Sequence, residues 1–460
     1  MNLETRLREL FAHIEDVTIQ RLVIGEGQTV ILAFSEGMID NRHLQEVVLP
    51  QLNQGLAKGD LRPLPLRTMS DDKKEWAERV FAGELLIFLD TSLPFSWDIC
   101  KRPERSPEET NTEVSIKGPR DGFIENIYAN VALIRKRLPS MTLTCEKFVL
   151  GTRSRTKVAV LYLKDSAPPD IVETIRERLR ACQDLKIVTS GILEKRLADK
   201  PYSLFPLLDY TGRPDKAIYM LLESKVIILV DGSPIALIGP MTLLEQIKSP
   251  EDDQYPLVYV WVERLLRLGG VWIAIFLPGY WVAVTAYNIE EFPFLLMATV
   301  AQGRKGMPFS APMELFFILF IFEFLREAGA RLPKTIGQTL ALVGALIIGD
   351  ASVRAGITSP SMLFVGALTV VASFTLVNQS LSGAVTVLRF KVFFLSATLG
   401  MYGFILSIMI IVYIVSSLTS FGRPYGLYAS SNVIATIVKS MFTPLKNLLK
   451  QNQGKGSDMQ

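Results

Sequence analysis

The sequence is poor in side chains that bind metals or act as nucleophiles, because its 460 residues include only three cysteines and two histidines. Cys100, Cys145 and Cys182 are odd in number, lie far apart and lack the spacing of a metal motif. With only His13 and His43 available, we do not expect a disulfide framework, a zinc site or a thiol–histidine catalytic pair. Motifs of a nucleotide-binding loop or a hydrolytic triad are also lacking. We therefore expect neither an enzyme nor a bound cofactor.

A large charge imbalance and an apolar leader are also missing. The formal net charge of +3 is too small to predict nucleic-acid binding. The first residues read MNLETRLRELFAHIEDV, where charged residues recur too often for the apolar core of a signal peptide. The N-terminal half is therefore expected on the cytoplasmic side.

Apolar residues are abundant, but they are distributed unevenly. The mean hydropathy is +0.28 and 49% of the residues are apolar, which is high for a wholly soluble protein. Up to about residue 250 charged and apolar residues mix, whereas long apolar runs dominate from Leu268 to Leu418. The predicted fold class is a cytoplasmic α/β region of two subdomains, followed by a helical transmembrane domain. The predicted segments are a first subdomain (1–100), a linker (101–112), a second subdomain (113–250), a membrane domain (251–420) and a C-terminal tail (421–460).

Periodicity predicts alternating helices and strands in the first subdomain. We expect a helix over 3–14, strands over 17–25 and 28–36, a helix over 43–52 and a strand over 85–90. The charged, proline-containing stretch from Lys101 to Thr112 has no large apolar residue and is typical of a linker.

The second subdomain is predicted to begin with a helix over 124–138. Asp121 is its expected N-cap, and Arg135, Lys136 and Arg137 suit its C-terminus. The elements expected after it are strands over 143–151, 157–165 and 185–189, a helix over 170–182 and a hairpin around Asp231-Gly232.

Two basic loops in this half have more than one interpretation. Lys117 and Arg120, in KGPRDG, can bind an anion, but a turn that leads into a capped helix is the plainer interpretation. Arg153 and Arg155, in GTRSRTK, can bind phosphate, but a solvated strand edge or a contact with a partner subunit is favoured. These four residues are candidates for subunit contact.

The membrane half contains five apolar segments. The first, 271–287 with its neighbours 268–270, is long enough to cross a hydrocarbon core of about 30 Å. Pro278 and Gly279 are expected to kink it, and Arg264 and Arg267 before it favour a cytoplasmic start. The other four are 314–329, 336–357, 360–377 and 393–418.

The number of complete crossings is predicted to be four or five. Residues 292–301 form an apolar stretch of about 15 Å, which is too short to cross and favours a re-entrant or interfacial element. Four lysines in the tail, opposed by Asp458 alone, favour a cytoplasmic C-terminus, so one of the five segments is expected to cross only in part. The lysines are Lys439, Lys446, Lys450 and Lys455.

Long strings in both halves resemble the A subunits of GerA-family spore germinant receptors. The membrane half has GRKGMPFSAPMEL, EFLREAGARLPKTIGQTLALVGALIIGDASVRAG, LRF and TSFGRPYG. The soluble half has EVSIKGPRDGFIENIYANVALIRKRL, GTRSRTKVAVLYLKD and VDGSPIALIGP. The resemblance covers about Glu113 to Gly426.

This resemblance implies a multi-pass receptor subunit in the inner membrane of a bacterial spore, in contact with membrane lipid. It implies as partners a transporter-like B subunit that holds the germinant and a lipoprotein C subunit. It also implies a homo-oligomer, as a ring, whose helices form a germinant-gated path for monovalent cations.

The chain departs from the family pattern at several places. It reads SFTLVNQSLSG where the family has a turn resembling Pro-Ser-Tyr-Ser, so the sequence itself does not predict a helix break near Val377. It reads SLFPLLDYTGRPDK where the family has a stretch resembling SPFPQ. Leu319 occupies a position where the family pattern has an acid.

Acidic residues in the apolar stretch ELFFILFIFEFLREAG are the first candidates for an ion path. A charge at the bilayer centre costs at least about 2.5–3.5 kcal/mol, so it needs water, a partner or an opposite charge. Glu314 and Glu323 lie nine residues apart, roughly 180° around a helix, and are expected to have different roles. Glu323 is predicted to pair with Arg326, next to Glu327. Glu314 is expected either to favour the helix dipole or to attract cations.

The next apolar segment is the second candidate for the pore. Asp350 and Arg354 are predicted to neutralise each other at i and i+4. Glycines and alanines of this segment allow helices to approach closely, which suits either tight packing around a ring or a narrow constriction. The constriction would be lined by Leu342, Val343 and Leu346.

Two other function classes remain open for this sequence. A secondary transporter would also carry intramembrane charges, but it usually has internal repeats and more spans. A non-conducting scaffold, or an accessory complex of the same superfamily, would satisfy its charges within the subunit.

Overall fold

The chain forms two compact units. The computed structural model describes residues 3–12, 14–24, 28–58, 61, 64–89, 94–100, 119–183, 189–249, 251–252, 255–332, 344 and 347–426. The N-terminal unit consists of residues 1–202, 207–241 and 419–423, and the helical unit consists of 203–206, 242–418 and 424–460.

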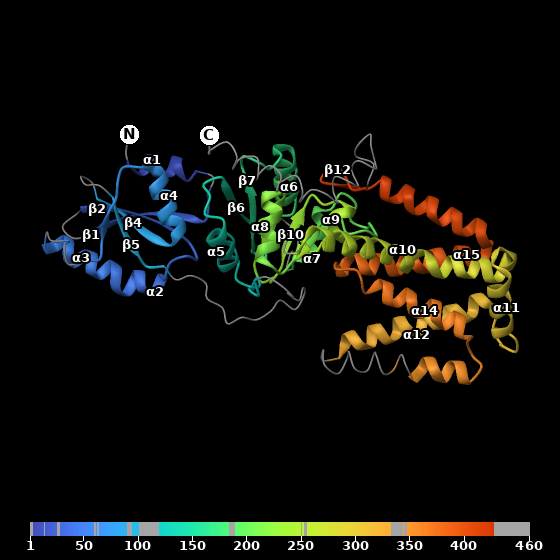
Figure 1. The fold of residues 1–460 in the computed structure, drawn as a ribbon. Helices are drawn as coiled ribbons and strands as arrows, with labels where there is room; N and C mark the ends of the chain where they lie inside the picture. The colour runs from blue at the N-terminus through green and yellow to red at the C-terminus, as the bar shows by residue number, and fades with distance from the viewer. Residues whose placement is uncertain are drawn as a thin grey trace, which may run out of the picture. The chain divides into compact units, whose positions relative to one another are not determined.

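The N-terminal unit contains two five-stranded sheets, in which neighbouring strands pair antiparallel (Figure 1). The first sheet has the order β1 (Val17–Ile24), β2 (Gln28–Ser35), β4 (Glu84–Leu89), β5 (Phe95–Asp98) and β3 (Arg67–Thr68). Its helices are α1 (Leu3–Leu10), α2 (Asn41–His43) with η1 (Leu44–Val48) and α3 (Leu49–Lys58), and α4 (Lys73–Ala82).

Strand β2 is apolar on both sides because helices cover both faces of the first sheet. Ile31 and Ala33 point into the core formed with α1 and α4. Val30, Leu32 and Phe34 point into the opposite core, which η1 and α3 complete. A continuous apolar run therefore predicts a central strand better than strict alternation does.

The second sheet has the order β6 (Leu143–Leu150), β7 (Thr156–Leu163), β9 (Val226–Val230), β10 (Ala236–Gly239) and β8 (Asp209–Thr211). Helices α5 (Ile127–Arg137) and α8 (Pro214–Leu222) cover one face with apolar residues. Helices α6 (Pro169–Ala181) and α7 (Ser190–Leu197) complete this part of the unit. The predicted hairpin at Asp231-Gly232 is confirmed as the antiparallel pair β9–β10.

The predicted cap of the first helix in this part was wrong. Asn126, and not Asp121, is the N-cap of α5, and its side chain accepts hydrogen bonds from the N–H groups of Tyr128 and Ala129. Asp121 instead binds Arg137 through both carboxylate oxygens, at 2.5 and 2.6 Å. The predicted linker at 101–112 and the predicted strand at 185–189 lie outside the described residues, apart from Thr189 at the strand's end.

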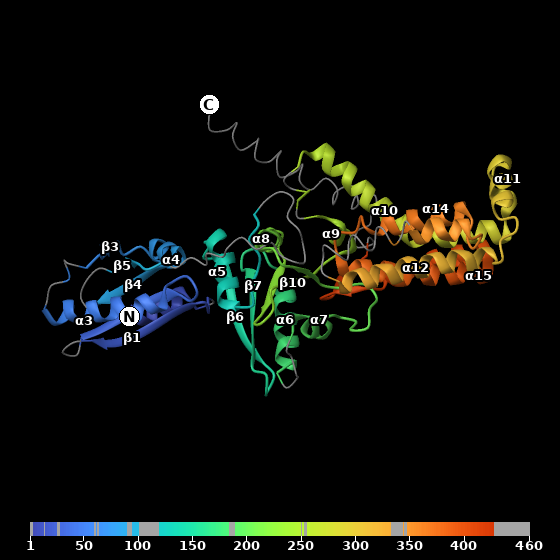
Figure 2. The same ribbon diagram turned by 90° about the horizontal axis from the view of Figure 1, so that it is seen from below.

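The helical unit begins with the short helix α9 (Leu243–Ile247), and its longer helices run alongside one another (Figure 2). These are α10 (Leu257–Tyr287), α12 (Ala311–Arg331), α14 (Pro360–Ser373) and α15 (Gln379–Ser416), with the one-turn η3 (Ile289–Glu291) and the short helix α11 (Phe294–Gly303) between α10 and α12. Helix α10 continues through Pro278. Close approach is possible where glycines face a neighbour: a Cβ on Gly279 would lie 2.7 Å from Val392 of α15, and one on Gly366 would lie 2.4 Å from Ile318 of α12.

Two helices in the described part of the chain, α10 and α15, are long and apolar enough to cross a membrane. Helices α11 and α14 are apolar but shorter. These helices support a membrane location, and a total of four to five spans stays a prediction.

The last apolar segment, expected as one helix over 393–418, has a sharp bend. At Gly400 the backbone has φ 60° and ψ −140°, which separates α15 into two arms. The second arm turns back from the end of the first (Figure 1). A break also occurs between α14 and α15, near Val377, because Asn378 caps α15 by accepting from the N–H groups of Ser380 and Leu381.

Candidate functional site

Glu314 is buried at a helix junction. Its side chain lies in the first turn of α12, and the residue is 1% exposed. Oε1 accepts hydrogen bonds from the Ser359 N–H (2.5 Å), the Ser359 hydroxyl (2.6 Å) and the Thr358 hydroxyl (3.2 Å). Since Ser359 is the N-cap of α14, the carboxylate lies where two helix N-termini favour negative charge. Arg304 Nε lies 3.5 Å from Oε2 and supplies a cation.

Glu323 occupies a different environment, two and a half turns further along α12. Its carboxylate binds Arg326 on the same helix. Arg326 also donates to the hydroxyls of Thr386 (3.0 Å) and Ser382 (3.4 Å) on α15. Glu314 and Glu323 therefore have separate partners and contact different neighbouring helices.

Arg389 is a third charged residue near Glu323, and no sequence pattern predicted a role for it. The residue lies on α15, is 1% exposed and has Nη1 at 3.8 Å from Glu323 Oε2. Its Nε donates to the carbonyl oxygen of Ala274 on α10, at 3.0 Å. Its Nη2 has no hydrogen-bond partner among the described residues. Glu323, Arg326 and Arg389, called the charge trio below, thus join α10, α12 and α15 and carry a formal charge of +1.

Two further pairs are exposed and local. Glu327 binds Arg331 at i+4 (2.8 Å), and Asp350 binds Arg354 at i+4 (2.8 Å). Asp350 and Arg354 lie in the helical stretch 347–354. The predicted constriction residues Leu342, Val343 and Leu346 lie outside the described residues.

The candidates for subunit contact lie on the surface of the N-terminal unit. Arg153 and Arg155 are exposed in the turn between β6 and β7, and Arg120 is exposed in the segment before α5. Lys117 lies outside the described residues. A role in subunit contact stays a prediction for all four.

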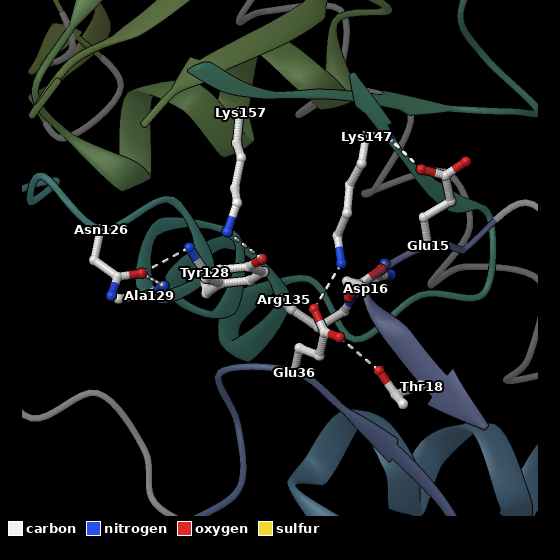
Figure 3. A network of polar contacts seen from close by, with 10 residues as sticks. All are labelled: Glu15, Asp16, Thr18, Glu36, Asn126, Tyr128, Ala129, Arg135, Lys147 and Lys157. Atoms are coloured by element: carbon white, nitrogen blue, oxygen red, sulfur yellow. Dashed lines mark hydrogen bonds and ion pairs between the residues drawn. The ribbon is translucent and has the colours of Figure 1, made fainter. Parts of the chain in front are cut away.

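A buried ion pair joins the two sheets of the N-terminal unit (Figure 3). Arg135 of α5 donates from Nη2 and Nε to the two carboxylate oxygens of Asp16, at 2.8 and 3.1 Å. Arg135 is 0% exposed and Asp16 2% exposed. The remaining Nη1 donates to the carbonyl oxygens of Ser140 and Leu143. The guanidinium also lies 4.4 Å from the ring centroid of Phe81 in α4.

A more exposed network lies beside this pair. Lys147 of β6 binds Glu36 at 2.7 Å, and Glu36 also accepts from the Thr18 hydroxyl. The Glu15 N–H donates to the carbonyl oxygen of Cys145, at 3.0 Å. Side-chain and backbone hydrogen bonds therefore both connect the first and second sheets. The Arg135–Asp16 pair is the buried part of this junction.

Replacing Asp16 by alanine should loosen this junction. Arg135 would remain buried without its counter-ion, which typically costs about 3–5 kcal/mol. Burial also raises the pKa of the Cys145 thiol, so the native protein should alkylate slowly there. We expect the full chain to unfold at a lower temperature in the variant. We also expect Cys145 to be alkylated faster, which mass spectrometry would measure.

Glu36→Gln serves as the matched control, because it breaks the part-exposed pair with Lys147 and should change the unfolding free energy by less than about 1 kcal/mol. Equal alkylation rates of Cys145 in Asp16→Ala and in the unsubstituted chain would contradict the assigned role of the buried pair.

Comparisons with known proteins identify the family. The chain is 39% identical to spore germination protein XA of Bacillus anthracis over 90% of this chain and 87% of that protein. It is 34% identical to spore germination protein B1 of Bacillus subtilis, over 92% and 90% of the two chains. The N-terminal domain of the A subunit of the Bacillus megaterium spore germinant receptor GerK3 matches with 23% identity and a TM-score of 0.39, over 52% of this chain and 94% of that one. The model of the Bacillus/Clostridium GerA spore germination protein family matches residues 5–452, and the chain therefore belongs to this family.

Proposed function

We propose that this chain is the A subunit of a nutrient germinant receptor in the inner membrane of a bacterial spore. In this proposal copies of the chain assemble into a ring, and their helices form a germinant-gated channel for monovalent cations. The partners would be a transporter-like B subunit, which holds the germinant, and a lipoprotein C subunit. The N-terminal unit would lie on the cytoplasmic side. Family membership supports the role in germination.

The observation that carries the channel proposal is the partial exposure of charge on α12. The side chains of Glu323 and Arg326 are 26% and 32% exposed, in a helix whose exposed large apolar residues are Met313, Phe317, Phe320 and Phe324. Charged groups at membrane depth cannot face lipid without a cost of several kcal/mol. A shared aqueous lumen between copies of the chain would remove that cost. The predicted pore elements remain α12 and the segment that contains Leu342, Val343, Leu346 and Asp350.

A second candidate function is a non-conducting scaffold or accessory germination subunit. Glu314, Glu323, Glu327 and Asp350 each have a cation within the same chain. Local neutralisation of this kind is what a scaffold requires, and it equally suits a closed channel.

Cation flux separates these functions. The purified full-length chain would be reconstituted into liposomes loaded with K⁺, and K⁺ efflux would be recorded with and without the co-reconstituted partner subunits and germinant. We expect efflux that follows the electrochemical gradient and requires no co-substrate. Absence of flux in every combination would favour the scaffold, and saturable flux coupled to a substrate gradient would favour a transporter.

A further inference from the structure

The segment directly after α15 belongs to the N-terminal unit, although the residues on either side of it belong to the helical unit. Thr419–Arg423 are grouped with the N-terminal unit, whereas residues up to Leu418 and from Pro424 onward are grouped with the helical unit. These five residues, called the return segment below, begin the string TSFGRPYG. The proposed channel function gives this string no role.

Two side chains fix the return segment in the N-terminal unit. The Ser420 hydroxyl donates to the carbonyl oxygen of Leu207 (2.7 Å) and accepts from the Met241 N–H (3.1 Å). Phe421 is 5% exposed and packs on Gly239 of β10, where a Cβ would lie 2.4 Å from the ring. Phe421 has φ 48°, a conformation that a side chain of this size rarely adopts without strong surrounding contacts.

Asp199 holds both ends of the turn in the return segment. Its Oδ2 accepts from the Thr419 hydroxyl (2.5 Å) and from the Gly422 N–H (3.0 Å). Its Oδ1 lies 2.7 Å from Nη2 of Arg178 in α6, and that guanidinium is 5.3 Å from the Phe421 ring centroid. Burial alone would raise the pKa of Asp199, but the hydrogen bonds from Thr419 and Gly422 and the Arg178 cation lower it overall. The carboxylate is therefore ionised at neutral pH.

The chain is anchored again immediately after the return segment. Tyr425 is 0% exposed in the helical unit, and its hydroxyl donates to Gln246 Oε1 of α9 at 2.9 Å. Its carbonyl oxygen accepts from the Leu243 N–H at 3.1 Å. The return segment thus follows the end of α15 after two intervening residues and precedes a buried tyrosine by one intervening residue, and its own residues are held by Ser420, Phe421 and Asp199.

We propose that the return segment is a coupling latch, held by Asp199, that transmits movement of the second arm of α15 to the N-terminal unit. The inference rests on the proposed function, because it assigns to the latch the coupling of a gated state. The second arm ends at Ser416, so Ser417 and Leu418 alone separate it from the latch, and this short connection is the route by which a shift of the arm would reach the latch. The latch in turn is hydrogen-bonded to the chain at Leu207 and Met241, which flank β8 and β10. Releasing the latch should leave both units folded, but movement of the second arm should no longer reach the N-terminal unit.

The test compares two acids that bind the return segment. Asp199→Ala removes the clamp, whereas Asp170→Asn breaks only the exposed pair between Asp170 and Arg423 (2.9 Å), with side chains 63% and 53% exposed. Amide hydrogen exchange of the full-length chain in nanodiscs would be measured on peptides that cover 419–424. We expect exchange there to rise at least tenfold in Asp199→Ala and less than about twofold in Asp170→Asn. Thr419→Val, which removes one donor at nearly constant volume, gives a milder second variant should Asp199→Ala not accumulate.

The functional measurement uses spores that carry the same variants at equal abundance. We expect the germinant-triggered release of cations to slow at least tenfold in Asp199→Ala and to stay within twofold of the unsubstituted protein in Asp170→Asn. Unchanged exchange at 419–424, or increased exchange with an unchanged germinant response, would overturn the latch. A failure of the unsubstituted protein to respond to any germinant would instead overturn the proposed function. The hydrogen-exchange result at 419–424 does not depend on a germinant, so it distinguishes a failure of the latch from a failure of the proposed function.

Discussion

Replacing Gly400 by alanine is expected to abolish accumulation of the correctly folded helical unit. The combination φ 60° and ψ −140° lies in a region that is essentially restricted to glycine, and forcing alanine into it costs about 1–3 kcal/mol. A Cβ at this position would also lie 3.0 Å from Cγ of Tyr287, whose hydroxyl donates to the carbonyl oxygen of Ala397 at 2.6 Å. Crowding of a packed site typically adds about 1–3 kcal/mol. The sum is a large part of the stability of an ordinary domain.

The expected consequence is loss of the bend. Without it, α15 would continue as one helix of 38 residues, about 57 Å long, and the second arm could not turn back. We expect Gly400→Ala to elute from size-exclusion chromatography as aggregate, or to unfold at a clearly lower temperature. Gly383→Ala is the matched control in the same helix, since a Cβ there meets nothing within 4 Å and alanine favours helix by about 1 kcal/mol. Equal stability of the two variants would show that the bend does not depend on Gly400.

This bend illustrates what the sequence could not reveal. Gly366 and Gly383 also interrupt apolar runs, yet both lie within continuous helices. A glycine in such a run permits a reversal without requiring one, so the outcome depends on tertiary packing, here of Tyr287 against Gly400 and of Gly403 against the backbone of Leu395. The break between α14 and α15 was obscured for a related reason. Asn378 supplies the cap by a side chain that the departure from the family pattern did not suggest.

Local patterns predicted the elements better than they predicted the partners of charged side chains. Strands and helices with continuous or alternating apolar residues, such as β2, β7 and α6, were predicted to within one or two residues. Arg135 was expected to stabilise a helix C-terminus, but its partner Asp16 lies 119 residues away in the sequence. The local periodicity of apolar residues does not indicate an ion pair between residues so far apart in the sequence. The same holds for Asp199 and Thr419, which are separated by 220 residues.

For the candidate ion path, too, the sequence predicted a local pair but not a contact between helices. The spacing of Glu323 and Arg326 was enough to suggest an intrahelical pair, because both lie on one helix face. Arg389 was overlooked because α15 contains no acid that could pair with it, and its role depends on the packing of α15 against α12. A basic residue in an apolar helix that contains no acid is itself a signal, since burying it favours an acid on a neighbouring helix.

Removing the acid of the charge trio is expected to destabilise the helical unit strongly. In Glu323→Gln, Arg326 retains the hydroxyls of Thr386 and Ser382, but Arg389 loses the carboxylate and keeps a single hydrogen bond to Ala274. Breaking a buried pair costs roughly 3–5 kcal/mol. We expect the lower end of that range, because the Glu323 side chain is 26% exposed and lies 3.8 Å from Arg389. The unfolding temperature of the detergent-solubilised chain measures the effect.

A second substitution should reverse the loss. Arg389→Met in the Glu323→Gln background removes the uncompensated cation and fills its volume with a flexible apolar side chain, so most of the stability should return. Glu327→Gln, one turn further along α12, breaks an exposed pair and should cost less than about 1 kcal/mol. A double variant no more stable than Glu323→Gln would contradict the assignment of Arg389 as the buried counter-charge. With stability restored, the cation flux of the double variant then reports on the path itself. Flux lost in a well-folded double variant places the Glu323–Arg389 pair on the ion path, whereas unchanged flux leaves this pair purely structural.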